Sequence, residues 1–396
     1  MGSISRRQTI AMGLSVALVG CGGDSASSSN SPPPPPPPPL PVKSVTSVAI
    51  ATFKAPWSLA FLPDGRILVT DNLTHTLSVV NLDGTVSNIP GLPDVGGLYD
   101  VVLSPFFSRD SKIYFTFAQP APPGTPRNGR QAADLTLFNG RLALATAQLV
   151  QTGSDLSLSN VTVIWGQTPY IAAEGEFGGR IAFSPDTKYL FLSTGDRQEF
   201  DPVQSLNNTL GKIVRLNLDG SVPAGNPFAA TAGALPEIWT LGHRNPYGLA
   251  FGPDGQLWES ENGPKGGDEF NLIKPGLNYG WPVVSYGDNY DGSLIKKPAP
   301  GDGFEPSAYW WTPAIAPAGM IFYKGNVFGD WRGDAILTGL VSKALIRVRL
   351  KGNGASEVQR IDMGARIRDI QEAVDGSLWV LEDAPTGRLL QISPVF

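Results

Sequence analysis

The sequence predicts an all-β fold, because turn-forming residues are abundant and charged residues are few. The chain has 396 residues, with 46 Gly and 36 Pro, and 16% of its residues are charged. This composition is typical of many short strands joined by tight turns. The net charge is -5, and the basic residues form no dense cluster with interleaved aromatic residues, so we expect no nucleic-acid partner.

The first 42 residues carry targeting and spacer features. Arg6 and Arg7 precede an apolar run that ends in LVGC, which resembles the lipobox of bacterial lipoproteins. We expect residues 1–21 to be a signal peptide and Cys21, the single cysteine, to be lipidated, giving an exported periplasmic or outer-membrane protein whose only membrane contact is this anchor. The Ser-Arg-Arg segment also resembles a twin-arginine export signal. Residues 22–42, which include eight consecutive prolines, are expected to form a disordered spacer.

A degenerate repeat runs through residues 43–396, which we expect to form one domain. It is a Pro-Asp-Gly-like turn followed by an apolar strand, in LPDGRILVT, SPDTKYLFLS, GPDGQLWES and VDGSLWVLE, with a worn copy in SPFFSRDSKIYFTF. A second recurrent piece, a strand and turn, is seen in VVNLDGT and VRLNLDGS. Because each Asp-Gly reverses the chain and copies span the whole domain, the pattern predicts a six-bladed β-propeller with four-stranded antiparallel blades.

The densest polar chemistry lies between residues 237 and 282. Here Leu249 and Leu257 belong to two short strand-like pieces, and we expect Arg244, Asn245, Glu261, Asp268 and Glu269 to lie on the connecting loops. The Arg244 guanidinium and the Asn245 amide suit a flat, oxygen-rich anion. The same residues are also compatible with plain turn capping.

Two further segments offer binding or catalytic groups. In RIRD, Arg366 and Arg368 alternate along a strand, so their side chains point the same way and can hold one anionic group, while Asp369 faces away or positions a neighbour. In EFGGR, Glu176 stands at the Gly-rich entrance to a strand, where a carboxylate that faces a pocket can act as a general base. A solvated strand edge is the alternative for the arginines.

The segment GPKGGDE offers exposed carbonyls beside two carboxylates, which is the chemistry of a Ca²⁺ site without the spacing of an EF-hand. Taken together, the motifs resemble those of the soluble aldose sugar dehydrogenases of the glucose/sorbosone dehydrogenase family. The resemblance covers residues 55–392 and rests on APWSLAFLPDGRILVTDN, GGLYDVVLSPFF, FGGRIAFSPD, LGKIVRLNLDGSVPAGNPF, GHRNPYGLAFGPDGQLWESENGPKGGDEFNLIKPGLNYGWP, IAPAGMIFYKGNVF and RIRDI. It implies a six-bladed propeller that uses pyrroloquinoline quinone (PQQ) and Ca²⁺ to oxidise a sugar or alcohol, passing the electrons to an external acceptor.

The resemblance also implies roles for individual positions. The carbonyls of Gly263 and Pro264 match those that bind the catalytic calcium, and Asp268 and Glu269 would support that metal loop. The expected quinone contacts are Arg244, Asn245, Arg366, Arg368 and, as an aromatic at the rim, Tyr309. Arg244 would also take part in catalysis by polarising the quinone carbonyl that accepts the hydride.

Three positions depart from the family pattern. Glu176 replaces the catalytic histidine, Val95 replaces a glutamine, and Val341 replaces a lysine for which Lys343 can substitute. The expected function is a PQQ- and Ca²⁺-dependent dehydrogenase with Glu176 as the base. Two alternatives stay open: a carboxylate-based enzyme that uses no quinone, and a lipid-anchored sugar-binding propeller whose catalytic centre is disabled.

Overall fold

A computed structural model describes residues 39–396 of the chain. The expected signal peptide, the lipidation site Cys21 and most of the expected spacer lie outside these residues. Val42, the last residue of that spacer, is buried, and its carbonyl accepts a hydrogen bond from the Gln359 side chain. Among the described residues, none of the helices has the length and apolar character needed to cross a membrane.

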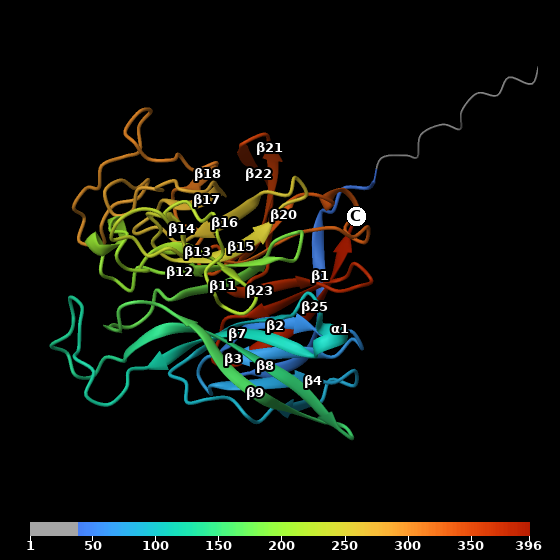
Figure 1. The fold of residues 1–396 in the computed structure, drawn as a ribbon. Coiled ribbons are helices and arrows are strands. Elements are labelled where there is room, and N and C mark those ends of the chain that lie inside the picture. The colour runs from blue at the N-terminus through green and yellow to red at the C-terminus, as the bar shows by residue number, and fades with distance from the viewer. Residues whose placement is uncertain (1–38) are drawn as a thin grey trace, which may run out of the picture. The chain divides into compact units, whose positions relative to one another are not determined.

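The strands form six antiparallel sheets, which confirms the predicted six-bladed β-propeller (Figure 1). The first sheet contains β2 (Pro56–Phe61), β3 (Ile67–Asp71), β4 (Thr76–Val80) and β5 (Val86–Asn88). The second contains β6 (Leu98–Leu103), β7 (Lys112–Pro120), β8 (Asn139–Thr152), β9 (Asp155–Gly166) and β10 (Ile171–Ala172). The third contains β11 (Gly178–Phe183), β12 (Tyr189–Thr194), β13 (Lys212–Asn217) and β14 (Ile238–Leu241).

The remaining sheets continue the same order and close the ring. The fourth contains β15 (Pro246–Phe251), β16 (Leu257–Glu261), β17 (Asp268–Ile273) and β18 (Tyr309–Trp311). The fifth contains β19 (Pro317–Phe322), β20 (Ala335–Gly339), β21 (Ala344–Lys351) and β22 (Gly354–Asp362). The sixth combines β23 (Ile367–Glu372), β24 (Leu378–Glu382) and β25 (Gly387–Val395) with β1 (Ser44–Phe53), so the two ends of the domain share one blade.

The second blade departs from the four-stranded expectation. Its strand β8 has 14 residues, and it pairs with β9 along most of its length and with β10 at Asn139 and Gly140. The few helical turns are short: α1 (Phe107–Asp110) and the 3₁₀ turns η1 (Asp201–Gln204) and η2 (Gly329–Trp331).

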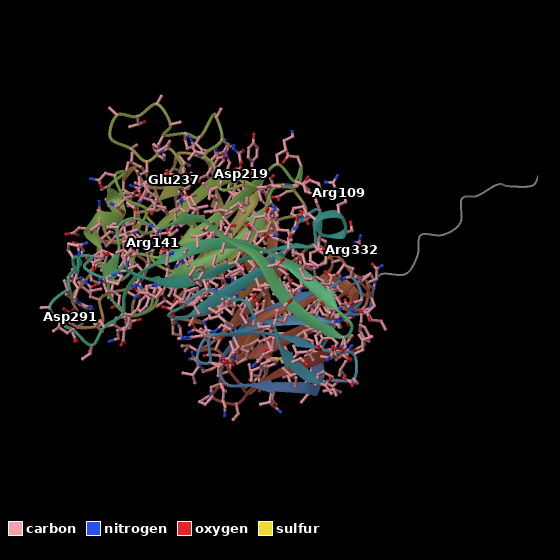
Figure 2. The ribbon with its side chains drawn as sticks, turned by 60° about the horizontal axis from the view of Figure 1, so that its bottom comes forward. Arg109, Arg141, Asp219, Glu237, Asp291 and Arg332 are labelled. Carbon is pink, nitrogen blue, oxygen red and sulfur yellow. The ribbon has the colours of Figure 1, made fainter. Side chains whose placement is uncertain are left out.

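The predicted repeat marks the same turn in successive blades. In LPDGRILVT, the Leu62 N–H donates to the Arg66 carbonyl, and in GPDGQLWES the Gly252 N–H donates to the Gln256 carbonyl. Each of these turns joins the innermost strand of a blade to the second strand. Figure 2 shows Arg109 and Arg332, from the equivalent connections of two other blades, at the end of the molecule opposite Asp291. These turns therefore leave the other end free for long loops.

Hydrophobic side chains fill the spaces between neighbouring blades. One core cluster joins the fourth and fifth blades and includes Trp258, Phe270, Leu337 and Ile346. Alternate residues of each strand face the adjacent blade, so every sheet is covered on both faces. This packing gives the inner strands a rigid base, and the residues that precede β11, β15 and β23 are held at one end of the ring.

Candidate active site

Three long connections project from one side of the molecule (Figure 1). They are residues 121–138, residues 195–211 and residues 274–308. Residues of all three line a cavity of about 610 Å³. The cavity is lined by Arg130, Glu199, Phe200, Asp201, Arg244, Pro264, Trp281, Pro282, Asn289, Tyr290, Asp291 and Ile295. Two residues singled out in the sequence, Arg244 and Pro264, are therefore at its wall.

Arg244 and Glu176 form the central ion pair of the site. Glu176 Oε1 lies 2.5 Å from Arg244 Nη2, and both side chains are largely buried. Arg244 Nη1 donates to the carbonyls of Asn262 and Gly263 at 3.0 and 2.9 Å. Arg244 Nε is buried and has no hydrogen-bond partner among residues 39–396. The structure thus brings together two predicted groups from different blades and leaves one cationic donor unused.

The backbone around Glu176 is held in an unusual conformation. Glu176 has φ 48°, in the left-handed region that non-glycine residues seldom adopt. Gly195 packs directly against this segment, because a Cβ at Gly195 would lie 1.9 Å from the Glu176 carbonyl oxygen. Asn245 Oδ1 accepts the Gly178 N–H at 3.2 Å, two residues after Glu176. Strained non-glycine residues of this kind cluster at functional sites.

Asp196 is a site residue that sequence reasoning did not identify. Burial, the charge of Glu176 and a hydrogen bond with Glu176 together raise the pKa of Asp196 well above its ordinary value. Trp281 Nε1 donates to Asp196 Oδ2 at 2.7 Å, which ties the cavity wall to the carboxyl pair. The available signal was a carboxylate two residues after an apolar strand, in STGD, but one such residue does not reveal its partner.

The loop of Gly263 and Pro264 is shaped by Asp268. Asp268 Oδ1 accepts the Gly263 N–H at 2.9 Å, and Oδ2 accepts the N–H groups of Ile315 and Ala316 at 2.7 and 2.6 Å. Burial raises the pKa of Asp268 to about 6, although these hydrogen bonds oppose the shift. Since both oxygens serve backbone donors, Asp268 supports the loop by fixing its conformation.

One expectation about this region is wrong. Glu261 is the last residue of β16, and Asp268 and Glu269 belong to β17, whereas the sequence pattern had placed all three on loops. Period-two apolar alternation fails here because β16 and β17 carry polar residues on both faces next to the site. Arg244 and Asn245 do lie on the expected connection, between β14 and β15.

Glu269 lies next to the Gly263 loop in a small polar cavity that Glu261 and Pro264 also line. The Ser307 hydroxyl donates to Glu269 Oε2 at 2.7 Å. Burial and the charge of Glu261 raise the pKa of Glu269 to about 8, against the effect of its hydrogen bonds. A nearby cation would lower the pKa of Glu269 again, because it favours the ionised carboxylate.

Arg366 and Arg368 point together, as alternation along the strand predicted. Both pair with Asp383: Arg366 Nε lies 2.6 Å from Asp383 Oδ2, and Arg368 Nη2 lies 2.7 Å from Oδ1. Asp369 faces the centre of the ring, where its Oδ1 lies 2.9 Å from Arg180 Nη2. Asp369 therefore positions a neighbour, which was one of the two expectations for it.

The remaining predicted contacts lie apart from the Arg244 group. Tyr309 is on β18, the outer strand of its blade, and packs edge-on against Trp311 with ring centroids 5.0 Å apart. Lys343 is exposed in the turn between β20 and β21 and makes no ion pair with any residue that the structure describes. Of the positions that depart from the family pattern, Val95 is buried in a core cluster and Val341 is exposed.

The geometry suits a flat anion beside a hard cation. The unpartnered Arg244 Nε is a buried donor at the wall of a roomy cavity, and an anionic ligand would satisfy it. The carbonyls of Gly263 and Pro264 lie on a loop fixed by Asp268 and beside Glu269, and such oxygens suit Ca²⁺, although the Gly263 carbonyl also accepts from Arg244 Nη1. The residues present therefore fit an anionic quinone and calcium.

The chain resembles known sugar dehydrogenases over most of its length. It is 36% identical over 356 residues to aldose sugar dehydrogenase YliI of Escherichia coli, covering 86% of this chain and 90% of that protein. The crystal structure of the soluble E. coli aldose sugar dehydrogenase in its apo form matches 89% of this chain and all of that chain with a TM-score of 0.81 and 32% identity. A PQQ-bound aldose sugar dehydrogenase from Streptomyces coelicolor matches 89% of this chain and 99% of that chain, with a TM-score of 0.70 and 26% identity. A sequence profile described as Glucose / Sorbosone dehydrogenase matches residues 53–391, and the chain belongs to this family.

Proposed function

We propose that this protein is an oxidoreductase that oxidises the CH–OH group of an aldose or another alcohol, using PQQ and Ca²⁺, with Glu176 as the base. The observation that carries the proposal is the ion pair of Glu176 with Arg244, the residue of the pair that lines the 610 Å³ cavity. Membership of a family of sugar dehydrogenases supports the substrate class, and the PQQ-bound relative supports the cofactor.

The residues that would hold the cofactor come from the connection between the third and fourth blades, from the fourth blade and from the sixth blade. Arg244 offers its unpartnered Nε, and the carbonyls of Gly263 and Pro264 offer calcium ligands. Arg366 and Arg368 supply a second cationic group at the start of an inner strand. When bound, PQQ supplies a two-electron acceptor, from which an external acceptor removes the electrons.

Glu176 would take the proton of the substrate hydroxyl on its carboxylate. Its ion pair with Arg244 and its left-handed backbone fix the direction of the side chain before substrate arrives. Asp196, whose pKa is raised by burial and by Glu176, would be protonated and would donate a hydrogen bond to Glu176. Before the reaction, Glu176 and Asp196 would share one proton, which Asp196 carries. When Glu176 takes the proton of the substrate hydroxyl, both carboxyl groups would be protonated.

A second candidate function is carboxylate-based chemistry without a quinone. One observation favours it: Glu176 already pairs with Arg244, and Asp383 already pairs with Arg366 and Arg368. An anionic cofactor would have to share these arginines with protein carboxylates. The remaining alternative, a sugar-binding protein whose catalytic centre is disabled, would bind its sugar in the same cavity without converting it.

Activity measurements separate these functions. The protein would be loaded with PQQ and Ca²⁺, and sugar-dependent reduction of an artificial electron acceptor would be followed over a broad sugar panel. The proposal expects reduction that needs both additions and that Glu176→Gln removes, while Glu174→Gln, two residues upstream and exposed, behaves as wild type. Conversion of a sugar without PQQ and without acceptor reduction, detected by product analysis, would favour the second candidate. Absence of acceptor reduction on all sugars would contradict the dehydrogenase.

We also propose that the protein is exported and lipid-anchored through Cys21. The support is the LVGC segment and the proline-rich spacer that follows it. Labelling with radioactive palmitate in a bacterial host, followed by membrane fractionation, is the direct test. Wild type should carry label in the membrane fraction and Cys21→Ser should not; equal labelling of both would contradict the anchor.

A further inference from the structure

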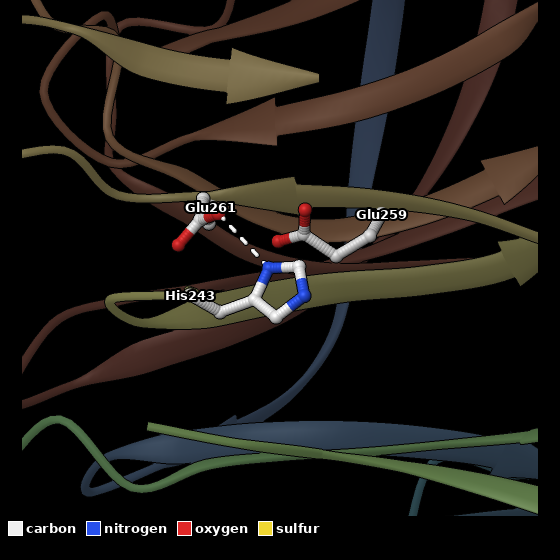
Figure 3. Close-up of side chains that lie close together, drawn as sticks. All are labelled: His243, Glu259 and Glu261. Carbon is white, nitrogen blue, oxygen red and sulfur yellow. Dashed lines mark hydrogen bonds and ion pairs between the residues drawn. The ribbon is translucent and has the colours of Figure 1, made fainter. Parts of the chain in front are cut away.

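A second polar cluster lies at the fourth blade, next to the Arg244 loop; none of its members lines the large cavity, and Glu261 lines the small one. The cluster consists of His243, Glu259, Glu261 and Asn271, all of which are buried. Figure 3 shows the Glu259 and Glu261 carboxylates turned toward the His243 ring from the adjacent strand β16. One ligand atom from His243, one from Glu259 and one from Glu261 all lie within 4.8 Å of one another.

The cluster has more negative charge than its protein neighbours balance. Within residues 39–396, neither Glu259 nor Glu261 forms an ion pair with a lysine or arginine side chain. Glu261 accepts the Arg244 backbone N–H at 2.5 Å and lies 3.2 Å from His243 Nδ1. Unpaired buried carboxylates are costly, because burial removes the water that stabilises their charge.

Two buried oxygen atoms in the cluster have no partner among the described residues. They are Glu259 Oε1 and Asn271 Oδ1, on side chains that are both 0% exposed. The Asn271 Nδ2 instead lies within hydrogen-bond distance of three carboxylates: Glu259 Oε2 at 3.1 Å, Glu261 Oε1 at 3.3 Å and Glu269 Oε2 at 3.2 Å. Turning this amide by half a rotation would present Oδ1 to the same point. The unsatisfied atoms are therefore acceptors only, as metal ligands are.

The histidine is oriented as a metal ligand would be. Thr240 Oγ1 lies 2.9 Å from His243 Nε2, so a neutral ring can donate its Nε2–H to Thr240 and turn the Nδ1 lone pair toward Glu261, whose Oε1 lies 3.2 Å away. The ring also stacks on Tyr279, with centroids 4.8 Å apart. Both contacts hold the imidazole in one plane without a metal.

We propose that His243, Glu259 and Glu261, with Asn271 as a fourth donor, bind one structural divalent cation, for which Zn²⁺ is the best match. One imidazole nitrogen with oxygen donors favours zinc over calcium, which prefers oxygen alone. Ligand atoms around zinc lie about 3–4 Å apart, given metal–ligand bonds of about 2 Å, so small side-chain shifts complete the site. The ion would stiffen the Arg244 backbone through Glu261.

The competing occupant is a proton. Burial, together with the charge of Glu261, raises the pKa of Glu259 well above its ordinary value, so a protonated Glu259 can also relieve the charge. Only the metal occupant would be found when the metal content of the purified protein is measured. This measurement needs neither a quinone nor a sugar.

The test uses the full chain, stripped with a chelator and then incubated with Zn²⁺ in the presence of excess Ca²⁺. After gel filtration, elemental analysis of wild type should find about one retained zinc per chain, with a raised melting temperature. Glu259→Gln should lose at least about tenfold in zinc affinity, and the exposed control Glu174→Gln should match wild type. No retained zinc in wild type, or equal retention by Glu259→Gln, would overturn the site.

A second measurement avoids dependence on a variant that fails to fold. Co²⁺ would be added to the stripped wild-type protein in the same calcium buffer, and visible absorption recorded. The site predicts ligand-field bands from a nitrogen and oxygen environment, which one equivalent of Zn²⁺ then abolishes. A spectrum identical to that of aqueous Co²⁺ would contradict the proposal.

Discussion

Two buried arginines, Arg180 and Arg244, come from neighbouring blades but are used in opposite ways. Arg180 pairs with Asp100 at 3.2 Å and with Asp369 at 2.9 Å, its Nε donates to the Tyr247 carbonyl, and its guanidinium lies 4.1 Å from the centre of the Trp57 ring. Arg244 has one carboxylate partner, a free Nε and a cavity beside it. A fully partnered arginine holds blades together, and a partly partnered arginine beside a cavity remains available to a ligand.

The largest effect on stability is expected at Arg180. Arg180→Met should lower the free energy of unfolding by about 3–5 kcal/mol, because it leaves the charges of Asp100 and Asp369 buried and unpaired. Denaturant titration followed by tryptophan fluorescence would measure it. Arg109→Met, on the surface, should change stability by no more than about 0.5 kcal/mol. An Arg244→Met variant that loses as much stability as Arg180→Met would break the distinction between the two arginines.

Glu176→Gln should have the largest effect on turnover. Removal of a general base lowers kcat by about 10²–10⁴-fold, and the fold should persist because glutamine keeps the shape of the side chain. Steady-state kinetics with a saturating sugar would give kcat, and circular dichroism would check the fold. If kcat stays within a factor of about three of the Glu174→Gln control, smaller than the loss of a base produces, the base lies elsewhere.

Arg244→Lys should mainly weaken the binding of PQQ. Lysine keeps the charge but loses the planar fork, which removes charge-assisted hydrogen bonds worth about 1.5–3 kcal/mol. Quenching of tryptophan fluorescence by PQQ in Ca²⁺ buffer would report the change in Kd. Arg130→Lys, at another residue that lines the same cavity, is the control. Equal losses at both positions would mean that the cavity attracts the anion only through its overall charge.

Lys212 extends the comparison of Arg180 with Arg244 to a third case, a buried basic side chain with no carboxylate partner among residues 39–396. Its Nζ donates to the carbonyls of Val203 and Leu210, and burial lowers its pKa to about 7. The unfolded chain therefore binds this proton more tightly, so stability should rise by up to about 1.4 kcal/mol per pH unit between pH 7 and 10. Below pH 7 this dependence should vanish. Denaturant titrations at several pH values would measure how the free energy of unfolding depends on pH. Lys212→Met should remove the rise between pH 7 and 10, and the same rise in this variant would contradict the lowered pKa of Lys212.

The fold was predictable because its signals are local. The turns at Asp64 and Asp254 reverse the chain wherever they occur, and the recurrence of such turns along the domain indicates repeated blades. Site residues within short motifs, such as Arg244 and Asn245, were found in the same way. Asp383 was missed as the partner of Arg366, because their closeness follows from the pairing of β23 with β24, and the sequence interpretation did not assign that register.

The pairs across blades were the least predictable part of the site. Glu176 and Arg244 are separated in sequence, and their ion pair depends on how the third blade packs against the fourth. Asp196 was likewise invisible as the neighbour of Glu176. Glu261 was misplaced on a loop because its buried neighbours are polar, and polar residues on both faces of a strand hide the alternation that marks it.

Calorimetric titration of PQQ into calcium-loaded protein tests most directly whether the Arg244 face is open to an anionic quinone. We predict saturable binding of one PQQ per chain that disappears when Ca²⁺ is removed and weakens in Arg244→Lys. The absence of binding heat at several temperatures, or binding that is indifferent to both Ca²⁺ and Arg244, would contradict the proposed site.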